Sequence, residues 1–103
     1  MYGYIYITTN NINNKKYIGK HKCNTFDTSY KGSGKLIKEA ILKYGIENFT
    51  TEILETCDSL QNLNDREIYW IQHFNACQDN SFYNIAKGGD GGIIWVLQIN
   101  THR

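Results

Sequence analysis

Residues 4–20 read YIYITTNNINNKKYIGK, and this stretch decides the fold. Two runs rich in tyrosine and isoleucine, 4–9 and 16–20, suit a β-strand, because aromatic and β-branched side chains pack well on its pleated surface. Between the runs lies a cluster of asparagines, which adopt positive φ more readily than most residues and therefore favour hairpin turns. The stretch predicts a β-hairpin at the start of the chain.

Three tyrosines of this hairpin are the first candidates for a functional site. Side chains alternate between the two faces of a strand, so Tyr4 and Tyr6 share one face. A suitable register would bring Tyr17 of the second strand alongside them. Aromatic residues are common in strands, so the cluster is equally consistent with simple packing.

The length and the cysteines limit the class of protein. The chain has 103 residues, enough for one domain with a single core. It contains no apolar run near the roughly 20 residues that span a bilayer, and no signal-peptide pattern opens it. Its three cysteines form no Cys-x-x-Cys pair, which argues against a disulfide framework or a zinc knuckle. This usage is typical of a protein of the reducing cytoplasm.

The charge is distributed unevenly along the chain. Residues 1–45 hold eight lysines and two acidic residues, whereas residues 46–103 hold three basic and eight acidic residues. A basic half indicates a polyanionic partner such as a nucleic acid. The acidic half could supply metal ligands or form a solvated surface.

The rest of the chain alternates helical and extended patterns. Residues 35–45 predict an amphipathic helix that Ser33 caps and Gly45 ends. The glycines within 32–34 could cradle a phosphate at the start of this helix, or simply give a flexible approach to it. Residues 60–74 predict a second helix. The other expected segments are a loop at 21–31, a strand at 50–57, a short run at 81–86 that could join a sheet edge, and a glycine-rich loop at 87–92.

Glu67 interrupts the apolar face of the second predicted helix. It lies four residues after Leu63 and four before Ile71, so it shares their side of the helix. A carboxylate there is unfavourable unless it is paired, protonated or bound to a metal ion. A salt bridge to a lysine or arginine at the edge of the core would explain it equally well.

Taken together, these features resemble the GIY-YIG nuclease superfamily, and within it the free-standing and intron-encoded homing endonucleases of phages. The resemblance is carried by Tyr4-Ile5-Tyr6, Tyr17-Ile18-Gly19, Glu67 and Asn84, in this order. It covers residues 1–92 and leaves 93–103 as a C-terminal tail or an extra strand. It implies an α/β (α+β) domain with a small mixed three-stranded β-sheet flanked by helices, in the order β-β-α-β-α.

The resemblance also implies a Mg²⁺-dependent endonuclease that hydrolyses phosphodiester bonds in DNA, with Mn²⁺ as an alternative ion. In this family pattern Tyr6 would activate the attacking water, and Tyr17 would assist it or hold the phosphate. Glu67 would be the metal ligand, consistent with the one or two carboxylates that Mg²⁺ commonly takes from a protein. Asn84 would brace the site. The lysines expected to contact DNA are Lys16, Lys20, Lys31, Lys35 and Lys38.

The sequence departs from the family pattern at two positions. Tyr4 stands where the first motif has glycine, and Asp27 stands about where the family has its catalytic arginine, ten residues after Tyr17. Arg66 precedes Glu67 and should point about 100° away from it around the helix. We therefore expect His21 and Lys22 to neutralise the phosphate, with Lys31 or Lys35 in reserve.

Two other interpretations remain. The same fold could be a non-catalytic nucleic-acid-binding module that uses its lysines for phosphates and its tyrosines for stacking. It could also be a structural or interaction domain, in which case the grouping of Tyr6, Tyr17 and Glu67 is a coincidence. A buried carboxylate beside the tyrosines favours the nuclease. The sequence leaves open whether the protein acts as a monomer or as a transient dimer on DNA.

Overall fold

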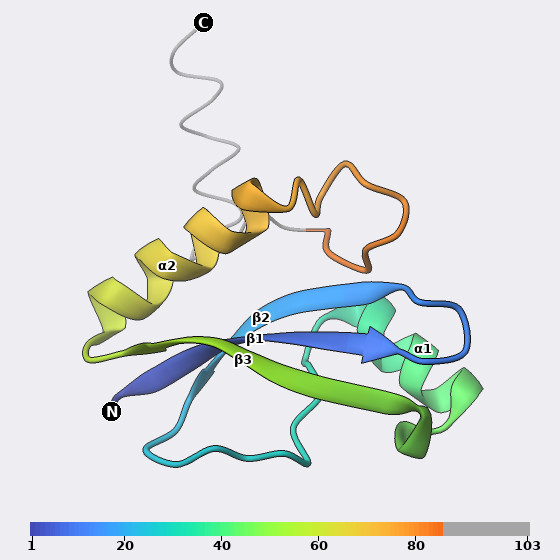
Figure 1. The fold of residues 1–103 in the computed structure, drawn as a ribbon, viewed down its shortest axis with the longest axis horizontal. Coiled ribbons are helices and arrows are strands. Elements are labelled where there is room, and N and C mark those ends of the chain that lie inside the picture. Colours follow the sequence, from blue (N-terminus) through green and yellow to red (C-terminus); the bar gives the residue numbers. More distant parts are fainter. Residues whose placement is uncertain (86–103) are drawn as a thin grey trace, which may run out of the picture.

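The computed structural model describes residues 1–85. The segments expected at 87–92 and 93–103, and the end of the domain expected at 92, lie outside the described residues. Within them the order of elements is the predicted one, with a short 3-10 helix added before the third strand (Figure 1). The elements are β1 (Gly3–Asn10), β2 (Lys16–Lys22), α1 (Lys35–Tyr44), the 3-10 helix η1 (Ile46–Asn48), β3 (Phe49–Cys57) and α2 (Leu60–His73).

The three strands form one antiparallel sheet in the order β2-β1-β3. The α+β architecture with three strands is therefore confirmed, but the expectation of a mixed sheet is wrong for these strands. Strands β2 and β3 do run in the same direction through the connection that contains α1, but β1 lies between them, so they do not pair. The parallel pairing among residues 1–85 is a single bridge between Lys16 and Phe82.

The hairpin of β1 and β2 has the geometry that its asparagines predict. Asn14 adopts a φ of 65°, and the Asn10 side chain accepts a hydrogen bond from the backbone N–H of Ile12 at 3.0 Å. The resulting register pairs Tyr6 with Gly19 and Thr8 with Tyr17. The side chains of these paired residues share one face of the sheet.

A different helix covers each face of the sheet (Figure 1), and different side chains are buried on the two faces. We call them the tyrosine face and the isoleucine face. Helix α2 covers the isoleucine face, where the buried core contains Ile5, Ile7, Ile18, Cys57, Leu63, Ile71 and Ala76. Helix α1 lies behind the sheet in Figure 1, and its Ile37 and Ala40 form a buried cluster with Phe49 of β3 and Tyr83 on the tyrosine face.

The helices begin close to their predicted positions. In α2 the N-cap is Ser59, whose hydroxyl accepts a hydrogen bond from the N–H of Asn62 at 3.1 Å. In α1 the N-cap is Gly34 instead of the predicted Ser33. A Cβ on Gly34 would lie 3.0 Å from the Tyr17 hydroxyl, so the chain enters this helix close against Tyr17.

The segment after α2 returns to the outer edge of β2. The N–H of Lys16 donates to the carbonyl of Ser81 at 2.9 Å, and the N–H of Tyr83 donates to the carbonyl of Lys16 at 2.7 Å. The expectation that the 81–86 run adds to a sheet edge is therefore confirmed for its main chain from Ser81 to Tyr83. No helix within residues 1–85 is long and apolar enough to cross a membrane.

Candidate active site

The tyrosine cluster forms as the hairpin register predicts. The rings of Tyr6 and Tyr17 lie 6.3 Å apart between centroids, on the same face of the sheet. The Tyr6 hydroxyl lies over Gly19, where an added Cβ would come within 2.3 Å of its oxygen. The glycine of the second motif is therefore needed as space for the Tyr6 phenol.

Tyr6 is fully buried and stays protonated. Burial raises its pKa far above the ordinary tyrosine value, with further increases from Tyr17 and Tyr30 and from a hydrogen bond to Tyr30. The Tyr6 hydroxyl is therefore neutral at physiological pH and hydrogen-bonded to Tyr30.

Tyr17 is the more accessible of the two phenols. Burial raises the pKa of Tyr17 to about 12, and the negative charge of Glu67 contributes in the same direction. A hydrogen bond from the backbone of Gly34 partly offsets this by lowering the pKa. The Tyr17 hydroxyl is therefore neutral at pH 7, and it can both donate and accept hydrogen bonds.

Tyr17 opens onto a cavity of about 350 Å³ at the outer edge of β2. We call it the β2-edge cavity. The start of α1, the inner side of α2 and the chain after Ser81 contribute to its wall. Its lining residues are Tyr17, Lys20, Ser33, Gly34, Lys35, Glu67, Ile71, Tyr83, Asn84 and Ile85. Tyr6 is absent from this lining, because it lies behind Gly19.

Glu67 is 8% exposed and lines this cavity, as its position on the apolar stripe of α2 predicts. Its charge reaches the tyrosines, because it raises the pKa of both Tyr17 and Tyr6. It is the one carboxylate among the described lining residues, and residues 1–85 contain no cluster of three or more His, Cys, Asp or Glu side chains that could hold a metal ion. Such a donor set suits Mg²⁺ or Mn²⁺, which retain water ligands and take oxygens from a bound phosphate, better than a tetrahedral zinc site.

Asn84 holds the floor of the cavity to the sheet. Its Oδ1 accepts a hydrogen bond from the N–H of Ile18 at 2.9 Å, and its Nδ2 donates to the carbonyl of Ile18 at 2.7 Å. The side chain thus takes the place of a neighbouring strand at the β2 edge. This contact fixes the last described segment beside Tyr17.

The predicted DNA-binding lysines divide into two groups. Lys20 and Lys35 line the β2-edge cavity, and the ammonium group of Lys20 donates to Asn64 of α2. The other three lie outside the lining. Lys16 donates to the backbone carbonyl of Asn14, Lys31 is half-buried in the loop before α1, and Lys38 is exposed on α1.

His21 and Lys22 lie on opposite faces of the sheet. Strand β2 continues through Lys22, two residues beyond the predicted strand, so these neighbours point to opposite faces. His21 stacks on Tyr30 at 3.8 Å on the tyrosine face, whereas the Lys22 ammonium lies 5.2 Å from the ring centroid of Tyr2. Neither side chain lines the β2-edge cavity.

Among residues 1–85 the family's arginine has no direct counterpart at the cavity, because Arg66 lies elsewhere and Asp27 is an acid. Arg66 donates to Glu55 of β3 at 2.7 Å and lies over the Tyr69 ring, which confirms that it points away from Glu67. Burial opposes the charge of Glu55, but the hydrogen bonds from Arg66 and Trp70 outweigh it and hold the pKa of Glu55 below its ordinary value.

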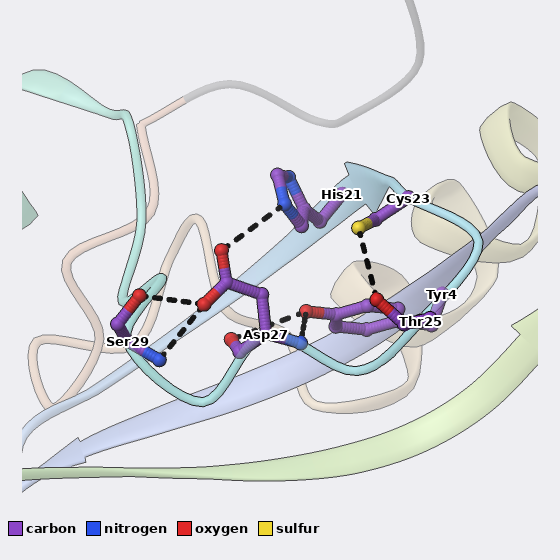
Figure 2. A network of polar contacts seen from close by, with 6 residues as sticks. All are labelled: Tyr4, His21, Cys23, Thr25, Asp27 and Ser29. Carbon is purple, nitrogen blue, oxygen red and sulfur yellow. Dashed lines mark hydrogen bonds and ion pairs between the residues drawn. The ribbon is translucent and has the colours of Figure 1, made fainter.

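The Asp27 carboxylate accepts hydrogen bonds from the backbone and hydroxyl of Ser29 and lies 4.0 Å from His21, as Figure 2 shows. These hydrogen bonds from Ser29 lower the pKa of Asp27, so the family's arginine position carries a negative charge in this chain.

Tyr30 is the residue that sequence reasoning did not assign to the site. Its ring lies 5.7 Å from that of Tyr6, edge to face, and it also stacks on His21. It comes from a loop without periodicity, so its sequence position indicates an aromatic anchor but not what the anchor contacts. Its contacts with Tyr6 and His21 depend on how the loop folds over the tyrosine face, which the local sequence does not specify.

Comparisons with known proteins show which sequences this chain is similar to. No protein-family model matches the sequence. The chain is 46% identical over 93 residues to the segB protein of Enterobacteria phage T4, covering 89% of this chain and 41% of segB. It is 39% identical over 93 residues to the endonuclease segA of the same phage, covering 88% of this chain and 41% of segA. The chain thus spans less than half the length of these relatives.

A solved structure shares the fold. The catalytic domain of the intron endonuclease I-TevI, determined as a point mutant, superimposes with a TM-score of 0.63 at 23% sequence identity. The match covers 88% of this chain and all of that domain. The α+β fold that the family resemblance implied is therefore confirmed.

The double hydrogen bond of Asn84 predicts a measurable contribution to stability. Asn84→Ala leaves the N–H and C=O of Ile18 without their partner, so we expect the free energy of unfolding to fall by about 2 kcal/mol. Urea unfolding followed by circular dichroism measures the change. Asn80→Ala, at an exposed turn position, is the matched control and should change it by less than about 0.5 kcal/mol. Equal effects of the two substitutions would contradict the bracing role.

Proposed function

We propose that this chain, which belongs to the GIY-YIG nuclease superfamily, is a Mg²⁺-dependent DNA endonuclease domain of the homing type, with Mn²⁺ as an alternative ion. The observation that carries the proposal is the convergence of Tyr17, Glu67 and two lysines on the β2-edge cavity. These residues come from three separate elements, and a carboxylate on the apolar side of α2 is unfavourable unless it is paired, protonated or bound to a metal ion. A phosphodiester with a divalent ion would use all of them.

Glu67 is the proposed metal ligand. It is held on a rigid helix beside Ile71, and the open side of the cavity leaves room for water and phosphate oxygens. A divalent ion bound there would supply positive charge to the phosphate as negative charge develops on it during hydrolysis. Its presence would also offset the effect of Glu67 on Tyr17, because a nearby cation favours an ionised phenol.

Tyr17 is the phenol that we propose touches the substrate. Its neutral hydroxyl can donate a hydrogen bond to a phosphate oxygen, or accept one from the attacking water and so orient it. Tyr6 is buried and is hydrogen-bonded to Tyr30, so its proposed role is to hold the cluster in place. In this assignment Tyr17 contacts the substrate and Tyr6 supports it, whereas the family pattern gave the main catalytic role to Tyr6.

Lys20 and Lys35 are the proposed replacements for the family's arginine. Both line the cavity, on the β2 side and at the start of α1 respectively. Their ammonium groups can stabilise phosphate charge electrostatically, although without the bidentate geometry of a guanidinium. Lys16, Lys31 and Lys38 would then contact the DNA backbone outside the reaction site.

The first prediction of this proposal concerns the metal ligand. Glu67→Gln keeps the shape of the side chain but removes its charge, so Mg²⁺-dependent nicking of supercoiled plasmid should fall by at least about 100-fold. DNA binding, measured by fluorescence anisotropy, should be retained. Glu52→Gln, on an exposed position of β3, is the control and should cleave normally. Wild-type protein that binds DNA but never nicks it with Mg²⁺ or Mn²⁺ would support the non-catalytic binding module instead.

The second prediction separates the two phenols. Tyr17→Phe removes the hydroxyl that opens onto the cavity, so the single-turnover cleavage rate should fall by about 100-fold or more. Tyr6→Phe removes a buried donor, so it should slow cleavage less and lower the melting temperature more. If Tyr6→Phe cleaves more slowly than Tyr17→Phe and the two variants have the same melting temperature, the catalytic role belongs to Tyr6 instead.

A further inference from the structure

Residues 23–34 connect β2 to α1 without helix or strand, and we call them the site loop. Two of its residues contact the phenols of the candidate site. Tyr30 packs edge to face on Tyr6 and is hydrogen-bonded to its hydroxyl, and the backbone of Gly34 bonds to Tyr17. The geometry of the site therefore depends on where this loop is held.

Tyr4 is the residue that fastens the loop to the sheet (Figure 2). Its hydroxyl accepts a hydrogen bond from the backbone N–H of Asp27 at 3.0 Å and lies 3.3 Å from the Asp27 carbonyl, to which it can donate. Its ring is 1% exposed and packs edge to face against Tyr6, His21 and Phe26. The contacts join the middle of the site loop to the first strand.

Asp27 and Tyr30 belong to one hydrogen-bonded turn, so the contact of Tyr4 with Asp27 also fixes the position of Tyr30. The N–H of Tyr30 donates to the Asp27 carbonyl at 3.1 Å, and the Asp27 carboxylate accepts from the backbone and hydroxyl of Ser29. Asp27 is thus held on both sides, by Tyr4 of β1 and by its own turn. A displacement of Asp27 would move the Tyr30 ring off Tyr6 and His21.

We propose that Tyr4 is a positioning residue for the candidate active site, and that its hydroxyl holds the site loop so that Tyr30 stays against Tyr6 and His21. The two departures from the family pattern are then parts of one arrangement. Tyr4 takes the place of the motif glycine, and the backbone that it binds belongs to Asp27, which takes the place of the catalytic arginine. The catalytic part of this inference rests on the proposed nuclease function, whereas the geometric part does not.

The geometric part is tested with Tyr4→Phe, which keeps the packed ring and removes only the hydroxyl. We expect the Asp27 amide to exchange with solvent about tenfold faster, because its acceptor is lost. The His21 ring protons, shifted upfield by the stacked Tyr30 ring, should move toward unstacked values in the NMR spectrum. His73, which stacks on Tyr69 of α2, is the internal reference and should not move.

Tyr69→Phe removes a phenol hydroxyl from α2, on the opposite face of the sheet, and is the matched control for both NMR measurements and for cleavage. Melting temperatures establish that each variant is folded. The single-turnover cleavage rate of Tyr4→Phe should fall by about tenfold, since small misplacements of reacting groups slow catalysis strongly.

The outcomes separate this inference from the proposed function. An unchanged Asp27 exchange rate and an unchanged His21 shift in Tyr4→Phe would overturn it, as would a wild-type Asp27 amide that exchanges at the rate of a free loop. If Tyr4→Phe shows the expected NMR changes but cleaves DNA at the wild-type rate, the positioning by Tyr4 does not matter for the reaction, and the catalytic part of the inference is overturned. The expected NMR changes in a protein whose wild type never cleaves would uphold the positioning and reject the nuclease.

Discussion

The register of β1 against β2 is the constraint on which the rest of the structure depends. By pairing Tyr6 with Gly19 and Thr8 with Tyr17, it places every hairpin phenol on one face and the isoleucines on the other. A shift by one residue would exchange the two faces and expose the core. The same register puts the empty side of Gly19 beneath the Tyr6 hydroxyl, so that the motif glycine and the motif tyrosine are sterically coupled.

The site lies at the edge of the sheet because β2 is an edge strand. A bare edge offers unpaired backbone groups, and here the chain after Ser81 and the Asn84 amide pair with them. That closure creates a cavity between the start of α1 and the inner side of α2, instead of a fourth strand. Glu67 and Tyr17 then reach the same space from opposite faces of the sheet.

Periodicity was sufficient to predict much of this arrangement. The spacing of Leu63, Glu67 and Ile71 fixed the inward side of α2, and strand alternation grouped the tyrosines. The side of the sheet on which Lys22 lies was not predicted, because the strand was expected to end at Lys20. The alternation of side chains between the two faces of a strand was therefore not applied to Lys22. Tyr30 could not be placed, since its contacts come from a loop that only tertiary packing orders. The antiparallel sheet depended on β1 separating β2 from β3, which no local pattern encodes.

The most direct test of the account is where a divalent ion binds. Paramagnetic broadening of backbone amide signals by Mn²⁺ reports proximity to the ion without requiring cleavage. The account predicts broadening centred on Glu67 and extending to the amides of Ile18, Gly34 and Asn84 around the β2-edge cavity, and its loss in Glu67→Gln. Broadening centred elsewhere in residues 1–85, or unchanged in Glu67→Gln, would contradict the assignment of this cavity as the metal-dependent site.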